Sequence, residues 1–337
     1  MFNIKTKLLT RIITFVMLIT MLFTNAPNVS AKDNLDKVEN NILIQVGLSQ
    51  EAIDHMSLGA KQNLIEAYKK DTSSVTAKTV VMEVDVLSEI DAYVNATPEE
   101  KIKYGLDDEK IKKMDNEIEI LSDMSDKEMK DKFDMDDVTV KLIREAIEPD
   151  KDYQIKNEAT DIQASGSITT SEMTYSQSAI NNSTSTGVNY DVYLNAWWKD
   201  WYVFGAFDDK VAVVWGGNLT QYSNYQYVDY YIQNHDSTWG GLSESRVPAY
   251  HESIVNAGGY YYFPQSLSSA KARNVEINFK LKQSGRNNQS TKILSQFCHQ
   301  TLGIDSSISI SASGLSVSLK PGTSYDSTAQ HSDVIYN

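Results

Sequence analysis

Five histidines and a single cysteine are the side chains in this sequence best suited to nucleophilic or metal chemistry. The histidines are spread along the chain, at His55, His235, His251, His299 and His331. Cys298 and His299 are adjacent in an alternating run, so a strand would point them to opposite faces and prevent a direct thiol–imidazole pair. We therefore expect Cys298 to be a small, buried, apolar residue.

The motifs of common hydrolases are incomplete. His251 and Glu252 begin like the helix of a zinc protease, but the position that needs a second histidine is Val255. The run 241–245, GLSES, lacks the final glycine of a nucleophile elbow. No phosphate-binding loop is present, and the carboxylates of a glycosidase have no recognisable spacing in sequence. These observations favour a protein that is not an enzyme and that carries no cofactor.

A calcium loop is the one metal site that the sequence suggests. Asp134, Asp136 and Glu145 fall at positions 1, 3 and 12 of such a loop. Position 5 is Val138, which has no side-chain oxygen, and position 6 is Thr139, where the sharp turn needs glycine. Asp136 is better explained by the preference for negative charge at the start of a helix. We therefore expect no metal at these residues.

The aromatic residues are more informative. Four of the five tryptophans lie in residues 188–216, and the first part of this stretch alternates with period 2. One face of the predicted strand would carry Val188, Tyr190, Val192, Leu194, Ala196 and Trp198, and the other Asn189, Asp191, Tyr193, Asn195 and Trp197. A second strand, 225–233, would place Tyr225, Tyr227, Asp229 and Tyr231 on one face.

Rings that share a face with Asn and Asp can form a platform for sugars or for a protein partner. The alternative is that these rings pack across strands or beneath a helical domain. The candidate ligand-binding residues are Tyr193, Trp197, Tyr225, Tyr227 and Tyr231.

Short alternating segments separated by Gly and Asn turns follow one another through the second half of the chain. This pattern predicts an all-β antiparallel sandwich, Ig-like or jelly-roll-like, with a barrel as the alternative. The cleanest strand is 273–282, with Val275, Ile277, Phe279 and Leu281 facing inward.

The first half instead carries helix signals, including capping boxes at 97–100 and 125–128. Residues 78–95 fit either a strand or a helix, and we expect a helix because the neighbouring segments are helical. Residues 47–57 are echoed by residues 105–115, and a repeated helix-start signature explains the echo better than a duplicated binding motif.

These elements predict an α+β multidomain protein. Residues 1–31 have the basic start, apolar run and small-residue site of a signal peptide cleaved after Ala31. We expect an acidic, all-helical N-terminal module over 32–161, a Ser/Thr-rich linker or hairpin over 162–187, and an aromatic-rich β-sandwich over 188–337.

Charge and cysteine usage restrict the partners. The formal net charge of −14 argues against nucleic acid and against anionic lipid or wall polymers. One cysteine cannot form an internal disulfide, and a thiol-poor exported protein fits a bacterial origin.

The sequence therefore predicts a secreted, non-enzymatic binding protein that recognises an extracellular glycan or protein through an aromatic face. Two alternatives stay open. One is a membrane-active, β-pore-forming toxin that inserts residues 163–192. The other is a pro-segment, formed by the helical region, that masks the β domain until proteolysis near 150–165.

Overall fold

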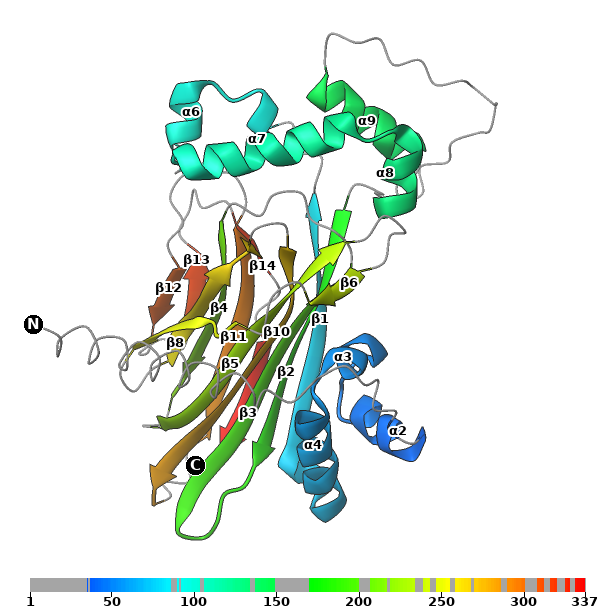
Figure 1. The fold of residues 1–337 in the computed structure, drawn as a ribbon. Coiled ribbons are helices and arrows are strands. Elements are labelled where there is room, and N and C mark those ends of the chain that lie inside the picture. Colours follow the sequence, from blue (N-terminus) through cyan, green and yellow to red (C-terminus); the bar gives the residue numbers. More distant parts are fainter. Residues whose placement is uncertain are drawn as a thin grey trace, which may run out of the picture. The chain divides into compact units, whose positions relative to one another are not determined.

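The computed structural model describes the chain in segments separated by gaps (Figure 1). The described residues are 35, 37–85, 90, 92–103, 106–133, 137–148, 170–199, 207–216, 219–233, 239–242, 247–254, 258–267, 270–285, 290–300, 308–311, 316–319, 325–327 and 331–336. The predicted signal peptide, 1–31, lies outside them, and so do Asp134 and Asp136 of the calcium candidate.

Seven described strands form one antiparallel sheet, sheet A. Its spatial order is β1 (Val75–Asp85), β2 (Thr170–Asn181), β3 (Gly187–Trp198), β10 (Ala270–Ser284), β5 (Thr220–Gln233) and β6 (Trp239–Leu242), and β9 (Ser266–Leu267) also pairs with β10. Strand β10 is central, because it pairs with β3 on one side and with β5 on the other.

Six described strands form a second antiparallel sheet, sheet B. Its order is β14 (Tyr325–Ser327), β11 (Ser290–Gln300), β4 (Asp208–Trp215), β8 (Gly258–Pro264) and β7 (Tyr250–Ile254), with β15 (His331–Tyr336) also paired to β11. A separate hairpin, β12 (Ile308–Ser311) and β13 (Ser316–Leu319), contacts β4 and β11.

The two sheets bury one shared apolar core, which makes them a sandwich. Sheet A contributes all six residues predicted to line the inner face of 188–198, together with Val275, Ile277, Phe279 and Leu281 of β10. Sheet B contributes Val211, Val213, Trp215, Tyr261, Phe263, Ile293 and Phe297. The predicted fold class, helices followed by an antiparallel β-sandwich, is confirmed, and period-2 alternation is its cause.

Strand β1 is an exception to the helical expectation. Our prediction of a helix over 78–95 is wrong for 78–85, which belong to β1, a strand that pairs with β2 over eleven residues. The run of β-branched residues alternates as a strand should, since Met82 lies in the core and Val81 is exposed. Pairing with β2 therefore overrides the helical spacing of Val80 and Val84, and the next described residue, Ile90, has helical backbone.

Strand β2 comes from the predicted Ser/Thr-rich segment. It lies between β1 and β3, so both of its edges are hydrogen-bonded. Ser176, Gln177 and Ser178 are buried within the sheet. Membrane insertion of residues 163–192 would have to break these two ladders and also the ladder between β3 and β10. The boundaries between domains at 161 and 187 stay predictions.

Helices α2 (Lys37–Gln45), α3 (Gln50–His55) and α4 (Leu58–Lys70) precede β1. Ser49 and Ser57 are the N-caps of α3 and α4, because their hydroxyls accept from Ala52 N–H and Ala60 N–H. A 3-10 turn, η1 (Thr72–Ser74), joins α4 to β1.

Helix α6 (Pro98–Lys103) is followed by α7 (Asp108–Asp123), α8 (Asp126–Phe133) and α9 (Asp137–Ile147). Helices α7, α8 and α9 share a second apolar core with Ile90, Tyr93 and Leu106. Both predicted capping boxes are confirmed by reciprocal hydrogen bonds between Thr97 and Glu100 and between Ser125 and Glu128. Among the described residues, no helix has the length and apolar character that crossing a membrane requires.

The sequence echo has a structural explanation in both copies. Leu48 and Met56 in the first copy, and Leu106 and Met114 in the second, are buried. Ser49 caps α3, and Asp107 caps α7 by accepting from Lys110 N–H. The shared residues thus start a helix and anchor it to a core.

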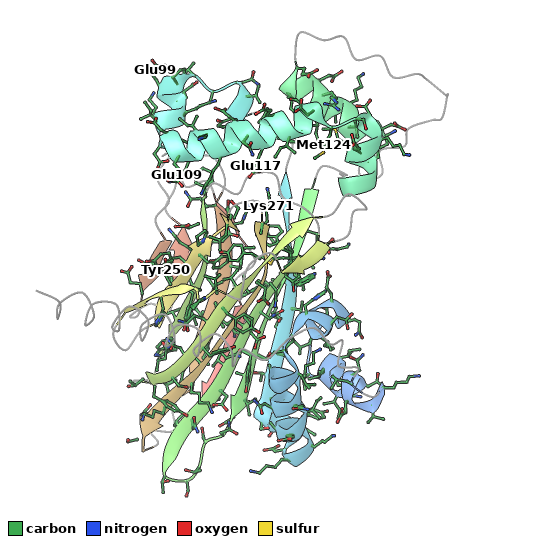
Figure 2. The ribbon with its side chains drawn as sticks, in the orientation of Figure 1. Glu99, Glu109, Glu117, Met124, Tyr250 and Lys271 are labelled. Atoms are coloured by element: carbon green, nitrogen blue, oxygen red, sulfur yellow. The ribbon has the colours of Figure 1, made fainter. Side chains whose placement is uncertain are left out.

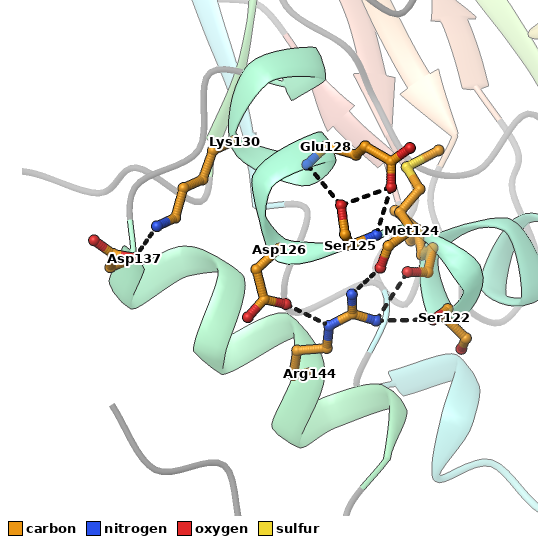
Figure 3. Close-up of polar contacts among 9 residues, drawn as sticks. Ser122, Met124, Ser125, Asp126, Glu128, Lys130, Asp137 and Arg144 are labelled. Atoms are coloured by element: carbon orange, nitrogen blue, oxygen red, sulfur yellow. Dashed lines mark hydrogen bonds and ion pairs between the residues drawn. The ribbon is translucent and has the colours of Figure 1, made fainter. Parts of the chain in front are cut away.

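Arg144 ties the end of α7 to α8 and α9 (Figure 3). Its guanidinium donates to the backbone carbonyls of Leu121, Ser122 and Met124 and to the Asp126 carboxylate. The last carbonyls of a helix have no partner within the helix, so this buried side chain satisfies groups that would otherwise lack a hydrogen bond.

We expect Arg144→Ala to lower the free energy of unfolding of the helical group by about 2–3 kcal/mol, because several carbonyls lose their donor at once. Urea unfolding followed by far-UV circular dichroism measures the change. The matched control is Lys141→Ala, which removes a surface ion pair with Glu145 on the same helix and should change stability by less than about 1 kcal/mol. Equal effects of the two substitutions would contradict this role for Arg144.

Candidate functional site on the outer faces of the sandwich

The strand register brings the predicted ligand-binding residues to one face of sheet A. Across β3, β10 and β5, Tyr193 is aligned with Asn278 and Tyr225, and the next row contains Asn195, Glu276 and Tyr227. Trp197 begins a third row with Asn274 and Asp229. Tyr231 follows a register shift between Ala272 and Asn274. We call this surface the outer face of sheet A.

Helix α3 covers the tryptophan of this face. The imidazole of His55 stacks on the indole of Trp197 with 3.3 Å between ring centroids and 7° between planes. The Arg273 guanidinium lies 4.2 Å from the centroid of the same indole, and the Tyr231 ring meets it edge-on. Trp197 is consequently only 8% exposed.

The start of α4 covers the two tyrosines next to it. Asn63 Nδ2 donates to Tyr193 Oη over 3.0 Å. Ser57 Oγ donates to Glu276 Oε1 over 2.6 Å, and Tyr227 Oη donates to Glu276 Oε2 over 2.5 Å. Tyr193 and Tyr227 are buried. Burial raises the pKa of Tyr193 to about 12, so its hydroxyl stays protonated at neutral pH.

A buried carboxylate needs several hydrogen bonds, and Glu276 has them. Besides the two hydroxyls, the Ser57 backbone N–H and Asn278 Nδ2 donate to it, over 3.3 and 2.8 Å. The carboxylate also lies at the N-terminus of α4, where the helix dipole favours negative charge. The same side chain thus fixes Tyr227 within the sheet and α4 upon it.

Tyr225 is the part of the predicted site that remains open to solvent. It is 50% exposed, and its ring meets Tyr227 edge-on at 5.2 Å. The other predicted residues lie beneath the helices or pack on aromatic rings that the helices cover. This is the alternative given in the sequence analysis, in which the rings pack across strands or beneath helices. Which of the five contact a ligand stays a prediction.

Sheet B presents a second aromatic surface, which we call the tyrosine ladder (Tyr250, Tyr260 and Tyr262). The register pairs Tyr250 with Tyr262 and Glu252 with Tyr260 across β7 and β8. The Tyr250 and Tyr262 rings stack at 5.2 Å with 20° between planes, and Tyr260 lies 6.1 Å from Tyr262. Tyr250 is 61% exposed (Figure 2). Its second ring face is therefore open to solvent.

The ladder arises from alternation along β8. Tyr261 and Phe263 enter the core, so Tyr260 and Tyr262 must point outward. Gly258 starts the strand at φ 144°, and a Cβ there would meet the Val213 carbonyl oxygen at 2.1 Å. Glycine therefore allows β8 to approach β4 closely.

Two opposite charges flank the ladder. Tyr260 donates a hydrogen bond to Glu252, which raises the pKa of the tyrosine to about 12 and keeps its hydroxyl protonated. Lys210 is the register partner of Tyr262 on β4. Sequence reasoning missed this surface, although the run Tyr260–Phe263 in strand alternation after two glycines was the signal that could have revealed it.

The described histidines and carboxylates offer no accessible catalytic pair. His299 Nδ1 lies 2.9 Å from Asp209 Oδ1, and Gln265 Nε2 donates to the same oxygen over 2.6 Å, but all three residues are fully buried. Cys298 is buried, as predicted. In the described part of the chain, no group of three metal-ligating side chains is placed to hold an ion. Glu145 of the calcium candidate instead pairs with Lys141.

An ion pair between Lys271 of β10 and Glu117 of α7 lies at the end of sheet A (Figure 2). The two charged atoms are 2.8 Å apart, and both side chains are largely buried. Phe207, which precedes β4, belongs to the apolar core of α7–α9. These contacts are structural, because they leave no open charge for a ligand.

Comparison with known proteins gives no family. No family model and no curated protein matches the chain. Solved structures resemble it only distantly. The T6 backbone pilin of Streptococcus pyogenes has a TM-score of 0.31 at 11% identity, over 48% of this chain and 35% of the pilin. The chain thus spans about a third of the pilin's length.

Two further structures are similarly distant. The collagen-binding domain of a Staphylococcus aureus adhesin has a TM-score of 0.25 at 11% identity, over 47% of this chain and 95% of that domain. A pore-forming protein has a TM-score of 0.24 at 9% identity, over 50% and 84%. Likeness at this level carries no argument about function.

We expect the Cys298 thiol to be unreactive in the folded protein. Burial raises its pKa to about 12, so almost no thiolate is present at pH 8. Iodoacetamide at pH 8 should leave the native chain unlabelled and should label it completely in urea, as read by intact mass. Rapid labelling of the native chain would contradict the burial described here.

We expect Trp197→Ala to destabilise the protein by about 3 kcal/mol, because the indole is packed between His55 and Arg273. Tyr225→Ala, on the same face but open to solvent, should change the unfolding free energy by less than about 1 kcal/mol. Thermal and urea unfolding measure both. Similar stability of the two variants would show that the helices do not rest on Trp197.

Proposed function

We propose that this chain is an exported, non-enzymatic protein that binds an extracellular glycan or protein through the tyrosine ladder. The observation that carries the proposal is Tyr250, which stacks on Tyr262 with one ring face and presents the other to solvent. Flat amphipathic rings held rigidly on a sheet bind partners with little loss of side-chain entropy.

The polar groups around the ladder suit a partner that both donates and accepts hydrogen bonds. Tyr260 and Glu252 supply a hydroxyl and a carboxylate, and Lys210 supplies a cation on the neighbouring strand. Opposite charges on the two sides favour a ligand with little net charge over a polyanion or polycation. Sugar hydroxyls and the peptide groups of a protein both meet this requirement.

The rest of the chain agrees with binding outside the cell rather than catalysis. The predicted signal peptide and the single, buried cysteine support export. Among the described residues, the pair formed by His299 and Asp209 is fully buried, so no substrate reaches it.

We expect the double substitution Tyr250→Ala, Tyr262→Ala to weaken binding at least about tenfold, since exposed aromatic anchors commonly contribute 1 kcal/mol or more each. A glycan array and a panel of immobilised extracellular-matrix proteins identify the ligand of the wild-type chain. Titration against that ligand then measures the change in affinity.

The matched control is Tyr222→Ala, which removes an exposed tyrosine from β5, outside the ladder. It should bind as the wild type does. All variants should keep the wild-type unfolding midpoint. Undiminished binding by the double variant would exclude the ladder as the binding surface.

A further inference from the structure

Polar groups of α2–α4 and of their N-caps contact the outer face of sheet A. These contacts include the ring stack of His55 on Trp197 and hydrogen bonds from Ser57 to Glu276, Asn63 to Tyr193, and Thr174 to Glu51. No residue of 37–70 belongs to the apolar core cluster of the sandwich. Interfaces of this polar kind resemble those between parts that separate reversibly.

The same helices bury apolar side chains of their own. Leu43, Leu48, Ile53, Met56, Leu64 and Ile65 are almost fully buried. Helix α2 contacts both α3 and α4, whereas α3 also contacts β2 and β3, and α4 contacts β1. The three helices are thus joined to one another through α2.

A short turn connects these helices to the sheet. Strand β1 begins at Val75, directly after the three-residue turn η1, and its eleven-residue ladder with β2 anchors everything that follows. Rotation about residues 71–74 would lift α2–α4 and leave sheet A intact. The backbone N–H of Ser49 donates to Thr79 Oγ1 of β1 over 3.0 Å, and this contact must also open.

We propose that residues 37–70 form a hinged cover that regulates access to the outer face of sheet A. In the closed state, the cover hides Tyr193, Trp197 and Tyr227, which are three of the predicted ligand-binding residues. Opening exposes them and returns the Glu276 carboxylate to water. The proposal concerns sheet A and does not depend on binding at the tyrosine ladder.

This arrangement revises the pro-segment hypothesis. Cleavage near 150–165 would leave the cover in place. Strand β1, which carries the cover, lies before the cut, and it stays paired with β2, which lies after the cut. Only opening at 71–74, or a cut there, uncovers the aromatic residues. The masking unit is thus the first three described helices rather than the whole segment 32–161.

Hydrogen–deuterium exchange of the full chain tests the proposal. In the wild type, amides of α2–α4 should exchange together and at least about tenfold faster than those of β3 and β10, as a separate opening unit does. Glu276→Gln weakens the link to Ser57, so it should speed exchange of 37–70 about tenfold while β3 and β10 keep their rates. The matched control, Asp191→Asn, changes a carboxylate of the same face that bonds to Asn182 and Lys280, and should leave α2–α4 unaffected.

A second variant protects the test against a folding defect in Glu276→Gln. His55→Gln removes the ring stack on Trp197 from the surface of α3, without touching the buried carboxylate, and should give the same selective rise. Equal acceleration of helices and strands in both variants would show a single cooperative unit and overturn the cover. Unchanged exchange of 37–70 in both variants would overturn it as well.

Discussion

The pairing of β10 with β3 and β5 determines both surfaces of sheet A at once. Inward residues of these strands, such as Ile277, Leu194 and Val228, form the sandwich core. The same register gathers Glu276 among Tyr193, Tyr227 and Trp197 on the opposite face. A carboxylate in such surroundings needs donors, and the start of α4 supplies two of them. The position of the N-terminal helices therefore follows from a charge in the middle of a β-sheet.

Local sequence patterns, namely strand alternation and helix capping boxes, predicted most of the fold. The alternation of 188–198 and 273–282 correctly assigned every core residue of those strands, and the capping boxes located the starts of α6 and α8. These signals are short in range and are set by side-chain direction and by hydrogen bonds within one turn. Alternation also placed the predicted aromatic residues on one face.

Contacts between distant segments could not be read from the sequence in this way. Residues 75–85 fit two periodicities, and only the presence of β2 decides between them. Nothing in the sequence near Trp197 indicates that His55 stacks on it. Helix α4, strand β1, helices α6–α9 and strand β2 all lie between the two residues in the sequence. The tyrosine ladder depends on the pairing of β7 with β8. The solvent exposure of an aromatic ring depends on which strands and helices pack around it, and amino-acid composition does not determine that packing.

The position of α6–α9 in the chain has a consequence for how the molecule folds. These helices lie within the connection between β1 and β2, two strands that are neighbours in sheet A. Closing a flexible loop of roughly 80 residues costs about 3 kcal/mol more chain entropy than closing a four-residue turn. A helical group that collapses early shortens the effective length of that loop. The speed at which the edge of sheet A is completed is then limited by folding of an insertion whose described elements are helices.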